Sequence, residues 1–206
     1  MTNSTTSERG RIWLTWDPVA VRVIILLNTR KMIHCSITII GSNCTFLESF
    51  AYGENDKSER KILWNDLAAI HSLAIPWMAL GEFNYLLYTS DKLNFGRRFQ
   101  IGNEELADVF MANDLTDLDY SGAHFTWNNQ QMGNQRVACK LDRIDVNSHW
   151  SSSFPNSVAQ FGNLGLSDHS PGILCVDLGN CFVVYPFKFK NYWVEEDDFG
   201  EVVRNS

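Results

Sequence analysis

The sequence predicts a layered α/β fold in which β-sheets and helices share one core. Three observations support this prediction: several β-rich runs near the N-terminus, two stretches with helical periodicity, and a short, wholly apolar run between them. The chain has 206 residues, of which 45% are hydrophobic and 20% charged, and these values are ordinary for a globular protein. This length fits one domain, or most of one, with a sizeable core.

The first quarter of the chain is expected to form an antiparallel meander. Its runs are rich in β-branched and aromatic residues, and turn signals such as Asp17-Pro18 and Gly41-Ser42-Asn43 separate them. The expected strands are residues 12–16, 19–27, 32–40 and 45–52.

Two helices are expected further along the chain. Asp56, three residues before Glu59, is typical of a helix N-cap, and apolar residues then recur at helical spacing, which predicts a helix over 57–73. A second helix is predicted over 103–113. Between these helices, residues 76–80 are wholly apolar, as expected for a strand buried on both faces.

The second half contains a predicted polar loop at 88–98 and short strands separated by Gly- and Asn-rich turns. The last twenty or so residues alternate aromatic and basic types and then become acidic, which favours a connecting segment. The short strands are expected at 125–127, 141–146 and 173–178. The predicted organisation is a polar lead (1–9), a domain (10–180) and a connecting segment (181–206).

Charge and cysteine usage exclude several classes of function. The net charge of −7 argues against gripping nucleic acid by bulk electrostatics, so any such role needs a local patch or a bound metal. Five scattered cysteines without a C-x-x-C pair favour a reduced intracellular compartment, nucleus or cytoplasm, with neither disulfides nor zinc. No signal-peptide-like segment starts the chain, and the most apolar run, 19–27, is interrupted by Arg22 and too short to span a membrane.

The most informative motif is Ser167-Asp168-His169, which precedes an apolar run. Neighbouring side chains on an extended chain point to opposite sides, so Asp168 and His169 can converge on one site only from a loop. Loops at strand ends are where reactive groups usually lie. The alternative is a turn that caps the following strand, and the motif by itself favours neither.

Two other segments place polar groups at predicted strand ends. Glu82 and Asn84 stand two residues apart, so they share a face and can reach one substrate together. Asp142 lies between apolar neighbours, where a charge is usually paired or functional. The alternatives are a turn cap for Asn84 and an ion pair of Asp142 with Arg143 or Lys140.

Taken in order, these motifs resemble the endonuclease/exonuclease/phosphatase superfamily, which has the DNase I-like fold. The family pattern is G-D-F-N, then L-D-R or L-D-Y, then S-D-H, and this chain has G-E-F-N, L-D-R and S-D-H. The resemblance is closest to the endonuclease region of plant LINE-type (non-LTR) retrotransposons and runs from roughly residue 9 to 203. Further matching segments are residues 10–13, 50–53, 60–64, 121–127 and 186–189.

The resemblance implies a four-layered DNase I-like β-sandwich flanked by helices and a metal-dependent phosphodiesterase that nicks DNA. Such chemistry needs a divalent cation on the phosphate oxygens, a carboxylate that activates water, and a cationic imidazole for the developing charge. Mg²⁺ or Mn²⁺ is the expected cofactor, because hard oxygen ligands suit these ions.

The same resemblance assigns roles to individual residues. His169 would contact the scissile phosphate, and Asp142 would orient its ring. Glu82 stands where the family has the Asp that activates water, and Asn84 where an Asn steadies the phosphate. Asp168 stands where the family has a metal-ligand carboxylate, and Tyr52 where it has a phosphate-contacting tyrosine. Thr126-Trp127 corresponds to a segment near the DNA. For Tyr52 and Trp127, a packing role is the alternative.

Two departures from the family pattern lead us to expect weak or lost activity. The N-terminal strands that carry a metal-binding Asn and Glu in the family have no match in residues 1–9, so the domain is expected to be N-terminally truncated. Glu82 is also one methylene longer than the family's Asp, and a 1 Å misplacement can cost about 100-fold in rate. The alternatives are a non-catalytic remnant that acts as a binding module, or a phosphatase acting on small phosphoesters.

Overall fold

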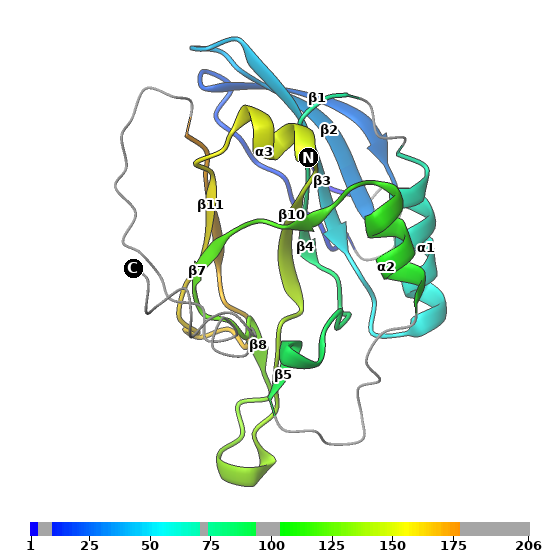
Figure 1. Cartoon of the computed structure of the whole chain (residues 1–206), viewed down its shortest axis with the longest axis vertical. Helices are drawn as coiled ribbons and strands as arrows, with labels where there is room; N and C mark the ends of the chain where they lie inside the picture. The colour runs from blue at the N-terminus through cyan, green and yellow to red at the C-terminus, as the bar shows by residue number, and fades with distance from the viewer. Residues whose placement is uncertain (4–9, 71–73, 94–103, 178–206) are drawn as a thin grey trace, which may run out of the picture.

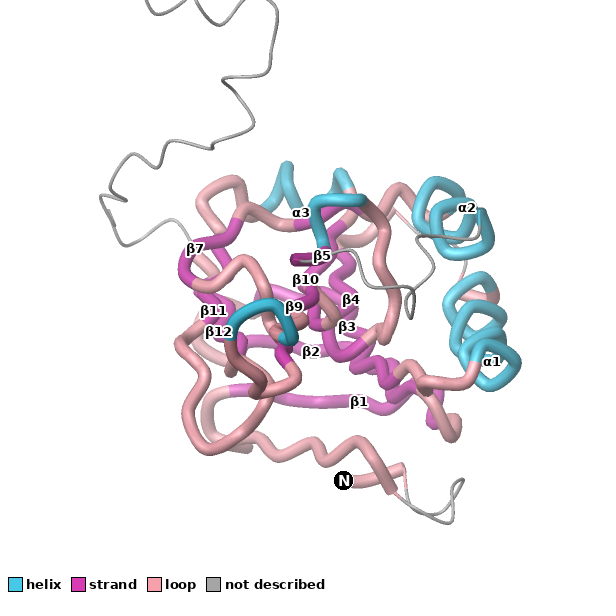
Figure 2. The backbone as a smooth tube through the Cα atoms, turned by 90° about the horizontal axis from the view of Figure 1, so that it is seen from below, coloured by secondary structure: helices cyan, strands magenta, loops and turns pink. Residues whose placement is uncertain are grey.

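The structure, a computed structural model, describes residues 1–3, 10–70, 74–93 and 104–177. A six-stranded sheet lies between a smaller sheet on one side and helices α1 and α2 on the other (Figures 1 and 2). The helices are α1 (Lys57–Ala68), α2 (Glu104–Ala112) and α3 (Ser148–Ser153), with 3₁₀ turns η1 (Thr89–Asp91) and η2 (Gly133–Gln135). The strands are β1 (Val21–Asn28), β2 (Met32–Ile39), β3 (Cys44–Tyr52), β4 (Trp77–Glu82), β5 (Lys92–Leu93), β6 (Thr116–Asp117), β7 (Tyr120–Gly122), β8 (Trp127–Asn128), β9 (Ala138–Cys139), β10 (Asp142–Val146), β11 (Val158–Phe161) and β12 (Gly172–Cys175). The predicted mixed α/β sandwich is confirmed.

The large sheet has the order β1-β2-β3-β4-β10-β6. Strands β1, β2 and β3 form the predicted antiparallel meander, whereas β3 and β4 are parallel and α1 connects them. Strand β10 then pairs antiparallel with β4. The smaller sheets have the orders β12-β11-β7 and β5-β9-β8.

Each face of the large sheet packs into its own hydrophobic cluster because side chains alternate along a strand. The cluster between the sheets includes Cys35, Phe46 and Met78. The cluster under the helices includes Leu63 of α1 and Leu106 of α2, both fully buried. Burial of both faces of β4 over residues 77–79 explains why this part of its sequence is wholly apolar.

Helix α1 begins where the sequence predicts. The Asp56 carboxylate accepts hydrogen bonds from the backbone amides of Ser58 (2.9 Å) and Glu59 (3.1 Å), which caps the helix. The helix ends at Ala68, earlier than the predicted end at 73. Its last turn tightens, because the Ile70 amide donates to the carbonyl three residues before it.

Several other predicted elements differ from the structure. Residues 12–16 are not a strand: within the described ranges, Trp13 forms one isolated bridge, with Thr2. Within the predicted polar loop 88–98, η1 and β5 bury Asp91 and Lys92. Strand β8 is shorter than predicted, and α3 and β11 are absent from the prediction.

Some of the sequence predictions concern residues that the structure does not describe. The predicted connecting segment, 181–206, and Cys181 fall there. In the described part of the chain, the other four cysteines are free thiols. No helix within the described residues is long and apolar enough to cross a membrane.

Candidate active site

Three predicted site residues form a row across neighbouring strands of the large sheet. Tyr52 of β3 is in register with Glu82 of β4, which is in register with Asp142 of β10. Adjacent strands are about 4.8 Å apart, so the row spans two strand spacings. The row lies at one end of the sheet, where β3 and β4 stop, and this position leaves each of the three side chains partly exposed.

His169 closes the row from a loop on the other side of the site. Its Nδ1 atom lies 2.9 Å from Asp142 Oδ2, and its Nε2 atom lies 3.7 Å from Glu82 Oε1. The imidazole and both carboxylates keep about a quarter of their surface exposed. The hydrogen bond to Asp142 raises the pKa of His169, with further contributions from the negative charges of Asp142, Glu82 and Asp168. The structure thus favours a cationic imidazole held between two carboxylates.

Glu82 and Asn84 are held by the end of the β3–β4 pair. The Gly53 amide donates to the Glu82 carbonyl at 2.6 Å, and the Asn84 side-chain amide donates to the Gly53 carbonyl at 2.7 Å. The Asn84 side chain also hydrogen-bonds the Glu82 carboxylate. Asn84 itself is buried, with a left-handed backbone (φ 50°) that asparagine tolerates better than most residues. Burial raises the pKa of Glu82, which brings this carboxyl closer to the range of a general base.

Gly53 is required by the same close approach. A Cβ atom at this position would lie 2.2 Å from the backbone oxygen of Phe83, which cannot move away without breaking the strand pair. Only glycine allows β3 and the segment after β4 to come this close. The glycine therefore keeps Tyr52 and Glu82 side by side.

Asp168 and Trp127 interact directly. The Trp127 indole N–H donates to Asp168 Oδ2 at 2.9 Å, and the backbone of Trp127 forms a bridge with His169. Trp127 is partly exposed. It therefore steadies the loop that carries His169 and keeps some surface at the edge of the site.

Thr126 supports the site from inside the protein. It is fully buried, and its hydroxyl accepts hydrogen bonds from the amides of Leu141 (3.1 Å) and Asp142 (2.9 Å). This placement does not fit the expected DNA contact, because the side chain has no surface to offer a ligand. The hydroxyl instead fixes the start of β10, where Asp142 stands.

Asp142 does not pair with its charged sequence neighbours. Arg143 points to the opposite face of β10, where it is fully buried and forms ion pairs with Asp91 and Asp117 (2.9 Å). Lys140 also pairs with Asp117, at 2.9 Å. The alternative of a plain ion pair for Asp142 is therefore wrong. This buried network lies behind the site, and no local sequence pattern predicts it, because its members come from three separate segments.

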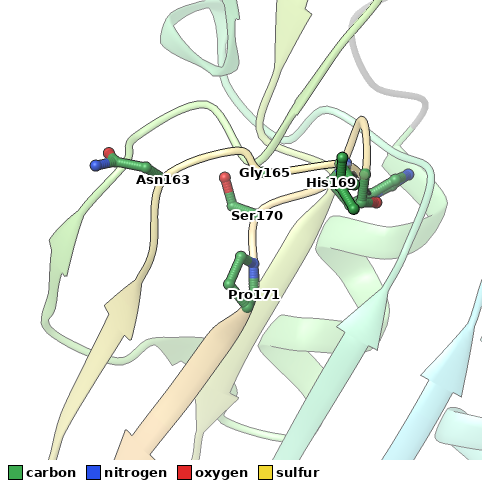
Figure 3. Close-up of a pocket in the computed structure, with 7 residues that line it drawn as sticks. Asn163, Gly165, His169, Ser170 and Pro171 are labelled. Atoms are coloured by element: carbon green, nitrogen blue, oxygen red, sulfur yellow. Dashed lines mark hydrogen bonds between the residues drawn. The ribbon is translucent and has the colours of Figure 1, made fainter.

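A shallow cavity of about 410 Å³ lies beside His169. Figure 3 shows the loop that forms it, with the side chain of Ser170 pointing toward the backbone of Gly165. The Ser170 hydroxyl is buried, and no hydrogen-bond partner for it occurs among the described residues. The lining residues are Asn163, Gly165, Leu166, Ser167, His169, Ser170 and Pro171.

Glu82 and Asp168 are the residues that fit a divalent cation. Besides burial, the negative charge of Asp168 contributes to the raised pKa of Glu82, so the two carboxylates lie within electrostatic range. Mg²⁺ binds through one or two carboxylates and completes its shell with waters and substrate phosphates, which this pair allows. Across the described residues, no three His, Cys, Asp or Glu side chains are arranged to enclose an ion without such additional ligands.

No family model matches the sequence, and no curated protein matches it. Among solved structures, the chain is similar to the endonuclease domain of TRAS1, a telomere-specific non-LTR retrotransposon, with a TM-score of 0.56 and 16% identity over 78% of this chain and 70% of that one. Sphingomyelinase C from Streptomyces griseocarneus aligns with a TM-score of 0.49 and 11% identity, over 72% of this chain and 59% of that one. The likeness to the TRAS1 endonuclease domain shows that the chain adopts the DNase I-like fold.

Proposed function

We propose that this protein hydrolyses phosphodiester bonds, with DNA as the substrate, through a cluster of His169, Asp142 and Glu82. The observation that carries the proposal is the position of the His169 ring between two carboxylates from adjacent strands, 2.9 Å from Asp142 and 3.7 Å from Glu82. Asp142 accepts one ring N–H, so the other nitrogen faces the open side of the site.

His169 supplies the positive charge that the reaction needs. The hydrogen bond to Asp142 raises the pKa of His169, which favours the cationic ring, and in that form the Nε2–H can donate to an oxygen of the scissile phosphate. Negative charge grows on these oxygens as water attacks. A fixed imidazolium stabilises that charge without reorganising at the moment of reaction.

Glu82 is placed to orient the attacking water and to take its proton. Its carboxylate lies beside the His169 Nε2 atom, so a water bound to Glu82 lies next to the phosphate that His169 binds. Burial raises the pKa of Glu82, which improves its match to a proton acceptor near neutral pH. Bound Mg²⁺ or Mn²⁺ would add Lewis-acid polarisation of the phosphate, with Asp168 as its carboxylate ligand.

Three observations favour DNA over a small phosphoester as substrate. The motifs of the chain resemble those of plant LINE-type endonucleases, and its fold is similar to that of the endonuclease domain of a retrotransposon, with a TM-score of 0.56. Trp127, partly exposed beside Asp168, also offers a flat ring against which a nucleotide can pack. The activity is expected to be weak, because Glu82 replaces the shorter Asp of the family motif.

A plasmid-nicking assay tests this function. The purified chain is incubated with supercoiled plasmid and Mg²⁺ or Mn²⁺, alongside a His169→Ala variant and a His149→Ala control on the exposed surface of α3. We expect slow nicking that EDTA abolishes, that His169→Ala lowers by about 100-fold or more, and that His149→Ala leaves unchanged.

Other outcomes would overturn the proposal in different ways. Nicking that survives His169→Ala would remove this cluster from the reaction. A total lack of metal-dependent nicking would leave the binding-module alternative. Hydrolysis of para-nitrophenyl phosphate, a small phosphomonoester, without plasmid nicking would show that the substrate is not DNA.

A further inference from the structure

Asn3 is completely buried and uses its whole side-chain amide to hold the chain in place. Its Nδ2 atom donates to the carbonyls of Arg30 (2.9 Å) and Thr29 (3.4 Å), and its Oδ1 atom accepts from the amides of Arg11 (3.0 Å) and Ile12 (3.1 Å). A buried amide with both donors and both acceptor positions satisfied fixes its surroundings strongly. Asn3 therefore clamps residues 11 and 12 onto the turn between β1 and β2.

This turn lies at the active-site end of the large sheet. The amide of Tyr52 donates to the carbonyl of Lys31 at 2.9 Å, so the turn sits beside the first residue of the Tyr52–Glu82–Asp142 row. Ile12 points into the core, and the alternation of an extended chain then turns Arg11 outward. The Arg11 guanidinium carbon lies over the Tyr52 ring, 5.3 Å from its centre, in a cation–π contact.

The charges along the row make this position chemically useful. Glu82, Asp142 and Asp168 give the site three carboxylates, which repel a phosphate. Two basic side chains flank them: His169 at the Asp142 end of the row and Arg11 at the Tyr52 end. A phosphate above Glu82 would thus lie between the imidazole and the guanidinium.

Arg11 is available for a ligand, whereas its basic neighbours are not. Lys31 forms ion pairs with Glu54 (3.0 Å) and Glu59 (3.5 Å), and Arg60 donates to backbone carbonyls. Arg11 makes no ion pair with any residue in the described ranges. Within those ranges no carboxylate holds the guanidinium, and its N–H groups can meet a phosphate in the two-pronged geometry that guanidinium groups favour.

We propose that Arg11 forms a phosphate-binding site beside Tyr52, next to the His169 cluster, and that the site holds a backbone phosphate of the nucleic acid substrate. Arg11 contacts the ligand, and Asn3 is a positioning residue that acts through Arg11. The assignment of the ligand rests on the proposed phosphodiesterase function, but phosphate binding itself is measured without any reaction.

The test uses the whole chain in metal-free, low-salt buffer, with inorganic phosphate and a short single-stranded thymidine oligonucleotide as probes. Binding is measured by calorimetry or by ³¹P line broadening. Arg11→Ala is expected to weaken binding of both probes by roughly 10-fold or more, and Arg11→Lys to recover only part of the loss. Arg22→Ala, which removes an exposed arginine on β1, is the matched control and should change binding less than about 2-fold.

Asn3 is tested by a double-mutant cycle, because its removal also affects stability. Asn3→Ala should weaken phosphate binding in the parent chain but not in the Arg11→Ala background, while its effect on the melting temperature is the same in both. A loss of phosphate affinity that is equal in both backgrounds would overturn the positioning role.

The experiments can disprove the Arg11 phosphate site and the proposed phosphodiesterase function independently of each other. Unchanged binding in Arg11→Ala, or an equal loss in Arg22→Ala, would overturn the phosphate site, whatever the nicking assay gives. Arg11-dependent phosphate binding in a chain that does not nick plasmid would support the site and remove the catalytic proposal.

Discussion

Shortening Glu82 by one methylene, in Glu82→Asp, is expected to speed phosphodiester hydrolysis. Glu82 Oε1 lies 3.7 Å from His169 Nε2, which is too far for a direct hydrogen bond and too close for a water between the two atoms. A bridging water needs roughly 4.6–5.6 Å, from two hydrogen bonds of about 2.8 Å. Loss of one carbon–carbon bond of about 1.5 Å retracts the carboxylate by about 1.3 Å, to about 5 Å, and creates that space.

The expected gain follows from the cost of misplacing a catalytic group, about 100-fold for 1 Å, so the initial nicking rate should rise by about 10- to 100-fold. The assay compares initial rates of plasmid nicking for the parent chain, Glu82→Asp and a Glu59→Asp control on α1, which makes the same change outside the row. A rate for Glu82→Asp that is equal to or below that of the parent, in a preparation whose activity depends on His169, would refute the reasoning.

The remaining predictions concern stability. Gly53→Ala should lower the free energy of unfolding by about 3 kcal/mol, because the new Cβ would lie 2.2 Å from the Phe83 backbone oxygen. Gly41→Ala is the control and should change this free energy little, because no atom lies within 4 Å of the new Cβ. Urea titration of both variants measures the difference. Glu48→Gln should stabilise the protein above neutral pH: burial raises the Glu48 pKa from 4.5 to about 7, so the parent loses about 3 kcal/mol as pH rises through that interval and the variant does not. His34 has the opposite sign, since burial lowers its pKa from 6.5 to about 4 and the stability it contributes above pH 6.5 is lost as pH falls toward 4. Urea midpoints of the parent should therefore vary little between pH 4.5 and 6.5, while those of Glu48→Gln rise with pH; a parallel pH dependence of the two proteins would contradict the assignment.

The sequence predicts best where one local signal dominates. The alternating runs of β1 to β3 and the Asp56 cap are such signals, and the structure contains both. The apolar run over residues 76–80 is equally clear, because burial on both faces of this part of β4 leaves no polar position. Helix α3 is not predictable in this way: it is six residues long and rich in serine, and the burial of Trp150 in the core stabilises it.

Only part of the candidate site can be predicted from the sequence. Motif order suggests that Glu82, Asp142 and His169 belong together, and the structure places them in contact. The clamp of Asn3 on Arg11 has no sequence signature, because it joins the first residues of the chain to a turn about 27 residues away. Such long-range hydrogen bonds depend on tertiary packing, and local patterns carry no information about them.

The pairing of β4 with β10 also determines when the site can exist during folding. The two strands meet across a chain separation of about 60 residues, and closing such a loop costs about 4 kcal/mol of entropy before any contact repays it. Glu82 forms with the early part of the sheet, whereas Asp142 and His169 arrive only with this late closure. A chain that is still being synthesised, or one in which β4 and β10 have separated, therefore has no assembled cluster of His169, Asp142 and Glu82. Any hydrolytic activity is confined to the completed fold.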